Sequence, residues 1–138
     1  MSAAQLAHIM VNQLTVRRDA RGELVVAELQ KDVQFPILRL FYVRDVPVGS
    51  VRGRHGHYRC RQMMICQKGR IKVDVSDGEG ARHFILKPGN FLVLEPGLIA
   101  TETYLDDDST LLVLCDQPYD PEDYIFTFEA LAAFRAQS

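Results

Sequence analysis

The sequence of 138 residues lacks tryptophan, has only three cysteines and shows no excess of charge of either sign. Its 16 basic and 18 acidic residues give a net charge of −2, so the composition contains no basic surface for a nucleic-acid backbone. No stretch approaches the ~20 apolar residues that cross a bilayer. We therefore expect neither a nucleic-acid partner nor a membrane partner.

The cysteines are odd in number and do not have the spacing of a metal site; they are Cys60, Cys66 and Cys115. Two of them lie in apolar runs, which favours buried free thiols in a reducing compartment. The first ten residues, MSAAQLAHIM, lack the basic stretch and the long apolar stretch of a secretion signal. We therefore expect a cytoplasmic protein.

The length of the chain bounds its organisation. A protein of 15.7 kDa buries about two-thirds of its surface on folding, which is enough for one core but not comfortably for two. The sequence has no linker, internal repeat or low-complexity segment. We expect a single domain over residues 1–138, in which residues 1–10 form a loosely ordered N-terminal segment.

Short apolar runs separated by turn residues follow these first ten residues. Ile71, Val73 and Val75 alternate with polar residues, which is the period of a half-buried strand. Other expected strands cover 24–26, 35–43, 62–66, 83–86, 91–94, 98–105 and 110–115, and only 128–136 has the pattern of a helix. Closely spaced short strands with Gly/Pro turns predict an all-β fold, a jelly-roll β-barrel with a short C-terminal helix.

Two of the four histidines lie together in the segment 52–57, Arg-Gly-Arg-His-Gly-His. On an extended strand His55 and His57 point to the same face, about 7 Å apart. Gly53 and Gly56 leave the backbone uncrowded, which suits the close approach of a ligand. A polar strand end that faces solvent is the alternative, and the two histidines alone do not decide between them.

Four arginines within ten residues surround this pair: Arg52, Arg54, Arg59 and Arg61. Guanidinium groups grip phosphate oxygens in a bidentate manner, so this density favours a site for a phosphate or a diphosphate. Arg59 and Arg61 could equally be ordinary surface residues.

The spacing around the histidines forms two motifs. After His55 the first motif continues with Gln62 and Gly69, and the second consists of Gly89 and the Pro-Gly pair at 96–97. This pattern resembles the paired motifs of the cupin superfamily, whose fold is a small β-barrel. In metal-binding cupins these motifs supply two histidines, a glutamate and a third histidine.

Here Gln62 occupies the position of that glutamate, and Ala100 or Thr101 occupies that of the third histidine. Only two good ligands remain, whereas a divalent metal normally takes three or four. We therefore expect no bound metal and no other cofactor.

Residues from about 16 to 128 resemble one cupin branch, the WxcM-like 3,4-ketoisomerases that act on dTDP-4-keto-6-deoxyglucose. The resemblance lies in four segments: 19–24, 35–43, 52–58 and 118–125. The last of them, Pro-Tyr-Asp-Pro-Glu-Asp-Tyr-Ile, is the most diagnostic, because a generic cupin has no reason to share it.

This resemblance implies an isomerase of deoxysugar biosynthesis that moves the carbonyl of a nucleotide-linked deoxysugar from C4 to C3 through an enediol. Histidine suits the proton transfers because its ordinary pKa, about 6.5, lies near working pH. It implies that His55 and His57 are the catalytic pair, with His57 as the base, and that Tyr42 places its hydroxyl near the sugar.

The resemblance also implies a set of substrate-binding residues. The arginines around the histidines are candidates for the diphosphate, and Arg21 matches a position beside the sugar that helps to set the stereochemistry of the product. Thr101 and Glu102 match further positions on the sugar side. The full set is Arg21, Arg52, Arg54, Arg59, Arg61, Thr101 and Glu102.

The sequence departs from the family at 100–103, where Ala-Thr-Glu-Thr replaces a string of tryptophan, a basic residue, glutamate and methionine. The basic residue helps to decide which face of C4 is protonated, so the configuration of the product stays open. Two other functions remain alternatives: a non-catalytic sugar-nucleotide-binding or regulatory cupin, and a metal-dependent cupin enzyme.

The family resemblance further implies a homodimer, in which N-terminal strands are exchanged between the subunits. The segment 11–26 fits this arrangement, because an added strand would cover an exposed sheet edge.

Overall fold

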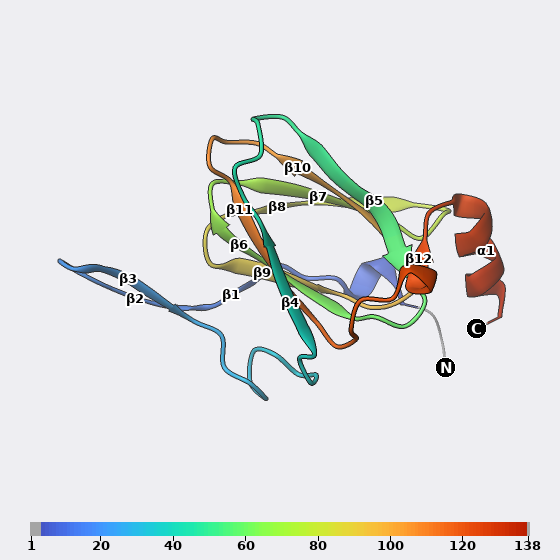
Figure 1. The fold of residues 1–138 in the computed structure, drawn as a ribbon, viewed down its shortest axis with the longest axis horizontal. Coiled ribbons are helices and arrows are strands. Elements are labelled where there is room, and N and C mark those ends of the chain that lie inside the picture. The colour runs from blue at the N-terminus through green and yellow to red at the C-terminus, as the bar shows by residue number, and fades with distance from the viewer. Residues whose placement is uncertain (1–3, 138) are drawn as a thin grey trace.

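The computed structural model describes residues 4–137, which fold into two five-stranded antiparallel sheets that face each other (Figure 1). The first sheet contains, in spatial order, β1 (Asn12–Gln13), β9 (Asn90–Leu94), β6 (Gln62–Lys68), β11 (Thr110–Cys115) and β4 (Arg39–Val43). The second contains β12 (Tyr124–Ile125), β5 (Val51–His57), β10 (Ile99–Tyr104), β7 (Ile71–Ser76) and β8 (Ala81–Leu86). The predicted all-β jelly-roll barrel is confirmed.

The apolar residues of the strands fill the space between the sheets. In β7 the side chains of Ile71, Val73 and Val75 are fully buried, as their alternation predicts. β6 is apolar on both faces because Met64 faces the barrel interior whereas Met63 packs under the segment before β4, against Phe35. A strand that is buried on both faces reads as a continuous apolar run.

The C-terminal segment closes one end of the barrel (Figure 1). The short 3-10 helix η2 (Pro121–Asp123) leads into β12, and the helix α1 (Phe128–Ala136) follows over the range that the sequence predicts. The Thr127 hydroxyl accepts a hydrogen bond from the backbone N–H of Ala130 and caps this helix. Leu131 is the buried residue of the helix and packs against Ile99 and Ile125.

Two parts of the chain differ from the expectation. The strand expected over 35–43 begins only at Arg39, because the residues before it form irregular structure that covers the outer face of β6. Residues 1–3 lie outside the described part. Residues 4–10, expected to be loosely ordered, include the 3-10 helix η1 (Leu6–His8) and the buried Ile9, and the Arg82 guanidinium bonds the backbone carbonyls of both Leu6 and Ile9.

The strands β2 (Thr15–Asp19) and β3 (Gly22–Val26) pair with each other and project from the barrel as a hairpin (Figure 1). Across residues 4–137 no helix is both long enough and apolar enough to span a membrane.

Candidate functional site

His55 and His57 lie at the end of β5 and face the barrel interior. Their ring centroids are 5.3 Å apart and the two rings meet edge to face. His57 is buried with 6% of its surface exposed, and His55 is half-buried. The structure therefore brings together the two histidines that the sequence singles out. They are not part of a polar strand end that faces solvent, which was the alternative.

Tyr124 covers both histidines from β12. Its ring centroid lies 4.9 Å from that of His55 and 4.7 Å from that of His57. Asp123 holds it there, because its buried carboxylate accepts hydrogen bonds from the backbone N–H groups of Arg59 (2.8 Å) and Cys60 (3.1 Å). The Tyr-Asp-Pro-Glu-Asp-Tyr-Ile string thus has a structural role, which is to fix an aromatic ring beside the histidines.

A cavity of about 340 Å³ opens beside His55, lined also by Arg39, Phe41, Gln62 and Tyr124. Several buried nitrogen atoms in this region have no hydrogen-bond partner among the residues that the structure describes: His55 Nδ1, His57 Nε2 and Arg39 Nε. A buried polar group normally has a partner, so these unpaired atoms mark the region as the candidate site.

The surroundings keep both histidines neutral near pH 7. Burial, followed by the charges of His55 and Arg39, lowers the pKa of His57 from 6.5 to about 4. Burial and the charge of Arg39 also lower the pKa of His55. A neutral imidazole that is shielded from water can accept a proton, so both rings can serve as proton acceptors near pH 7.

These shifts predict a dependence of stability on pH. The unfolded chain binds a proton at His57 below pH 6.5, whereas the folded protein binds it only near pH 4. Acidification from pH 7 to 4 should therefore cost about 3 kcal/mol of unfolding free energy through this residue. The contribution of His57 is the difference between the pH dependence of urea unfolding in the wild type and in His57→Asn. The carboxylates titrate in both proteins, so their contribution cancels. Equal pH slopes in the two proteins would contradict the assignment.

A β-bulge in β5 decides which arginine shares the face of the histidines. His55 pairs with Ala100 and Arg52 pairs with Glu102, so three steps along β5 correspond to two along β10. Arg54, with φ of 63°, is the extra residue and is exposed. Because of this bulge Arg52 points to the same side as His55, whereas a regular strand would place it on the opposite side.

Glu102 lies on the same inner face as Arg52. Its carboxylate is buried, and this burial raises the pKa of Glu102 to about 7, against the opposing effect of Arg52. Thr101 lies between the inward-facing Ala100 and Glu102 and therefore points to the outer face of β10.

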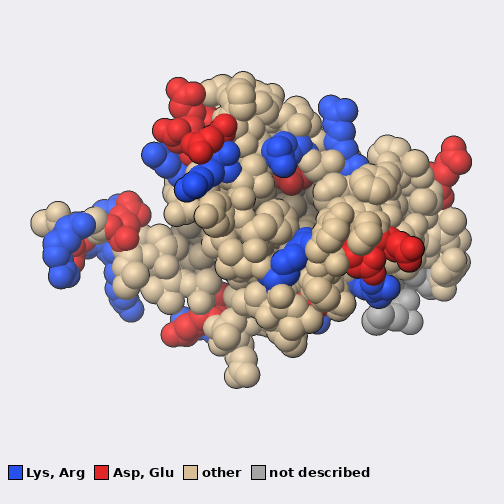
Figure 2. Space-filling view, in the orientation of Figure 1, with Lys and Arg blue, Asp and Glu red and all other residues tan. Residues whose placement is uncertain are grey.

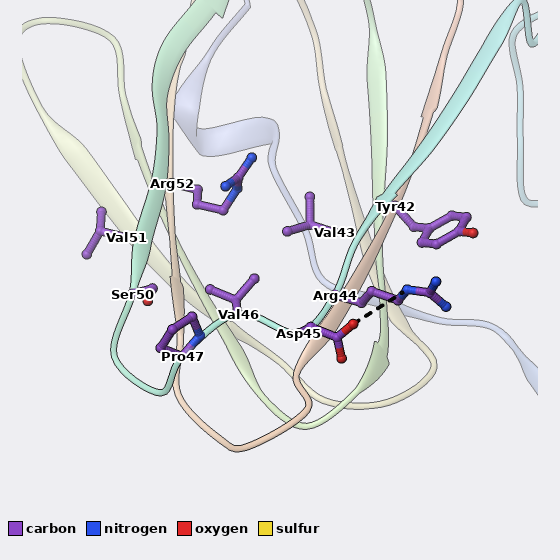
Figure 3. Close-up of a pocket in the computed structure, with 9 residues that line it drawn as sticks. All are labelled: Tyr42, Val43, Arg44, Asp45, Val46, Pro47, Ser50, Val51 and Arg52. Carbon is purple, nitrogen blue, oxygen red and sulfur yellow. Dashed lines mark ion pairs between the residues drawn. The ribbon is translucent and has the colours of Figure 1, made fainter.

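A second cavity, of about 690 Å³, lies at the loop between β4 and β5 (Figure 3). Arg52 and Val43 line it between the two strands, and Tyr42 and Arg44 line it beside β4, where the Arg44 guanidinium lies over the Tyr42 ring. Tyr42 is 54% exposed. Within this chain the structure does not bring Tyr42 to the histidines.

The expectation that the two glycines leave room for a ligand is wrong. A Cβ atom at Gly56 would lie 1.9 Å from the backbone oxygen of Leu98, and one at Gly53 would lie 2.3 Å from Glu102 Oε2. The space beside each glycine is thus filled by β10, and the glycines allow the two strands to approach closely.

The remaining predicted arginines form ion pairs away from the cavity. Arg59 pairs with Asp120 at 2.6 Å, Arg61 pairs with Asp116 at 2.8 Å, and Arg21 pairs with Asp19 at the tip of the projecting hairpin. Basic and acidic side chains are mixed on the face shown in Figure 2, with no continuous basic surface.

The side chain in the metal position of the cupin glutamate makes another contact here. Gln62 donates through Nε2 to Cys115 Sγ at 3.6 Å, and within residues 4–137 no three His, Cys, Asp or Glu side chains gather around one point. The three cysteines are buried and free, as predicted.

Sequence reasoning missed two residues of this site, Arg39 and Tyr124. Arg39 could have been noticed as a charged residue at the start of an apolar strand, and Tyr124 is part of the diagnostic C-terminal string. Neither sequence pattern indicates that these two residues lie next to the histidines in the fold.

Comparison with known proteins finds relatives that carry the name of a 3,4-ketoisomerase or 3,4-oxoisomerase. The curated TDP-4-oxo-6-deoxy-alpha-D-glucose-3,4-oxoisomerase of Aneurinibacillus thermoaerophilus is 29% identical over 120 residues, which are 86% of each chain. A 3,4-ketoisomerase from Helicobacter canadensis superposes with a TM-score of 0.84 at 26% identity, covering 92% of this chain and 97% of that one.

A double mutant of the 3,4-ketoisomerase from Thermoanaerobacterium thermosaccharolyticum, in complex with TDP, gives a TM-score of 0.87 at 25% identity over 96% and 98% of the two chains. The model of the family described as FdtA, WxcM-like, C-terminal, matches residues 7–136. Since this match spans both sheets and the C-terminal helix, the chain belongs to the FdtA, WxcM-like family.

Proposed function

We propose that the protein is an isomerase that moves the carbonyl of a dTDP-4-keto-6-deoxyhexose from C4 to C3. The observation that carries this proposal is the pair of buried histidines, His55 and His57, whose ring nitrogens Nδ1 and Nε2 have no hydrogen-bond partner among the described residues, with His55 lining an open cavity. The family and the names of the relatives supply the reaction and the nucleotide.

In this reaction neutral His57 accepts the proton from C3, which the neighbouring ketone makes acidic. The electron pair of the C3–H bond forms the C3=C4 bond of the enediolate, and the C3 hydroxyl passes its proton to the C4 oxygen. The proton that His57 accepted then passes to His55, which delivers it to C4 as the C3 carbonyl forms, so that both imidazoles end neutral. The 5.3 Å between the two rings allows both to reach one sugar.

Arg39 is the group that faces developing negative charge on the enediol oxygen. Its Nε is buried without a partner in the region of the cavity, and its guanidinium lies over the rings of Phe41 and Tyr119. A cationic donor in a site shielded from water stabilises such charge strongly. Tyr124, in contact with both imidazoles, limits the positions that the sugar can take.

Arg52 and Arg54 are the residues that bind the diphosphate in this proposal. No ion pair engages these two arginines among the described residues, whereas carboxylates neutralise Arg59 and Arg61. Glu102 completes the inner face beside Arg52. Tyr42, Thr101 and Arg21 do not line the cavity beside His55 within one chain, and their contact with substrate stays a prediction.

The experiment that tests this function incubates the protein with dTDP-4-keto-6-deoxyglucose and follows the carbonyl by NMR. We expect the C4 keto signal to be replaced by a C3 keto signal. Binding of the nucleotide sugar without conversion would instead favour the non-catalytic binder, which the replaced string at 100–103 motivates. A protein that neither binds nor converts this sugar would overturn the proposal.

A homodimer with exchanged hairpins is part of the proposal. The hairpin β2–β3 pairs only with itself within the described residues, and Leu24 and Val25 expose 62% and 44% of their surface. A two-stranded hairpin is marginally stable alone in water, so a partner subunit that covers it would stabilise it.

This arrangement predicts that Leu24→Asp converts the dimer into a monomer. Light scattering after size exclusion should give twice 15.7 kDa for the wild type and the single mass for the variant. Ile85→Asp is the control. Ile85 is 43% exposed and lies on β8, the edge strand of the second sheet, outside the hairpin. A monomeric wild type would rule out the exchange.

The free thiols support the predicted cytoplasmic location. Cys60, Cys66 and Cys115 are all reduced in the fold. Reduced cysteines are the normal state in the reducing cytosol.

A further inference from the structure

Arg39 is a half-buried cation without a carboxylate partner among the described residues. Its Nη2 lies 3.7 Å from Cys115 Sγ, and its Nε has no partner. Burial of a guanidinium without a neighbouring anion is costly, because the lost hydration is not replaced. The sulfur of Cys115 is therefore the group to consider as its counter-charge.

Hydrogen-bond donors converge on that sulfur. Cys115 is fully buried at the end of β11, between Arg39 on β4 and Gln62 on β6, and it pairs with both in register. Gln62 Nε2 lies 3.6 Å from Sγ and Arg39 Nη2 lies 3.7 Å from it. Both nitrogen groups can only donate, so the sulfur accepts in both contacts.

Other groups near Cys115 also favour its thiolate. The neighbouring thiol of Cys60, just before β6, followed by Gln62 and Arg39, lowers the pKa of Cys115 against the effect of burial. The next residue, Asp116, is held by the backbone N–H and the guanidinium of Arg61. Its charge is thereby compensated locally.

Cys66 provides a contrast within the same protein. It is equally buried, but its sulfur lies 3.5 Å from the carbonyl oxygen of Lys68 and 3.2 Å from that of Gly69. Carbonyl oxygens only accept, so the thiol of Cys66 keeps its proton and donates. Burial raises the pKa of Cys66 to about 12.

We propose that Cys115 is a thiolate in the folded protein and is the buried counter-ion of Arg39, which it positions beside the two histidines. Cys115 is thus a positioning residue: it contacts Arg39 and Gln62, and acts on the reaction only through the guanidinium. The effect on turnover rests on the proposed function, whereas the thiolate itself does not.

The direct test is a pH titration of the ultraviolet absorbance of the thiolate. The wild type and Cys66→Ser should both show a step with a midpoint below the range of an ordinary thiol, and Cys115→Ser should lack it. A step that persists in Cys115→Ser, or no step below the range of an ordinary thiol, would overturn the proposal. Circular dichroism of each variant confirms that it is folded.

The pairing with Arg39 has its own measurement. Removal of the cation in Arg39→Gln should move the midpoint of the Cys115 step upward by about one pH unit or more, since a nearby positive charge favours the thiolate. An unchanged midpoint would show that Cys115 is not the counter-ion of Arg39.

Turnover supplies the third readout. Cys115→Ser loses a hydrogen bond to a charged group, so we expect its kcat/KM to fall about ten-fold. The kcat/KM of Cys66→Ser should stay within about two-fold of the wild type. The wild type could show the thiolate step, and Arg39→Gln could shift its midpoint, while the wild type does not convert the sugar. In that case the proposed function fails and the ion pair between Arg39 and Cys115 stands.

Discussion

Replacement of His57 by asparagine should lower kcat for carbonyl migration by about 10²–10⁴-fold, the range expected for loss of a general base. Asparagine keeps a polar side chain of similar reach but cannot accept the C3 proton. The binding of TDP should change little, because the arginines proposed for the diphosphate lie elsewhere on β5. The NMR assay measures the rate, and calorimetry with TDP measures the binding.

His83→Asn is the matched control for this variant. His83 is exposed on β8 and pairs with Asp74, at the opposite edge of the sheet from Tyr124. Its rate should equal that of the wild type. Full turnover by His57→Asn would remove His57 from the mechanism, and loss of TDP binding would show that the histidine acts in ligand binding instead.

The second large effect is expected for Gly56→Ala, which places a methyl group between the two histidines. The added Cβ atom would lie 1.9 Å from the Leu98 backbone oxygen and 2.8 Å from its carbonyl carbon. Backbone atoms of a paired strand cannot yield as a flexible side chain can, so β5 and β10 must separate. We expect a loss of about 4 kcal/mol or more in unfolding free energy, in the range of severe core substitutions.

Urea unfolding at pH 7 measures this loss as a lower midpoint. Gly80→Ala is the control, because its Cβ atom would meet Leu6 Cδ1 at 3.8 Å, an ordinary contact. An unchanged midpoint in Gly56→Ala would mean that the strands are not in close contact there. In that case the spacing of the two imidazoles would need another explanation.

Local pattern was sufficient to predict much of the fold. The alternation in 71–75 predicts the one-sided burial of β7, and the apolar periodicity of 128–136 predicts α1 with the same bounds. These predictions succeed because side-chain direction in a regular element follows from its own period. The pattern does not predict the hairpin β2–β3 as an independent unit, since its strands are exposed and lack a strong apolar alternation.

The same reasoning reached the histidines but not the whole site. His55 and His57 lie two residues apart, so their shared face follows from the strand period alone. Arg39 and Tyr124 lie 16 residues before and 69 residues after His55 in the sequence. Only the packing of β4 and β12 brings them to the imidazoles, and no local pattern contains that information.

Local sequence pattern is enough to predict a β-barrel, two histidines on one face of a strand and buried thiols. The charge partners and the contacts of the site depend on how the strands pair. The bulge at Arg54 moves Arg52 to the face of the histidines, and distant carboxylates neutralise Arg59 and Arg61. The tertiary structure also decides that Cys115 meets Arg39 while Cys66 meets carbonyl groups. Pairing between strands sets register, burial and charge partners, and it joins residues that lie far apart in the chain.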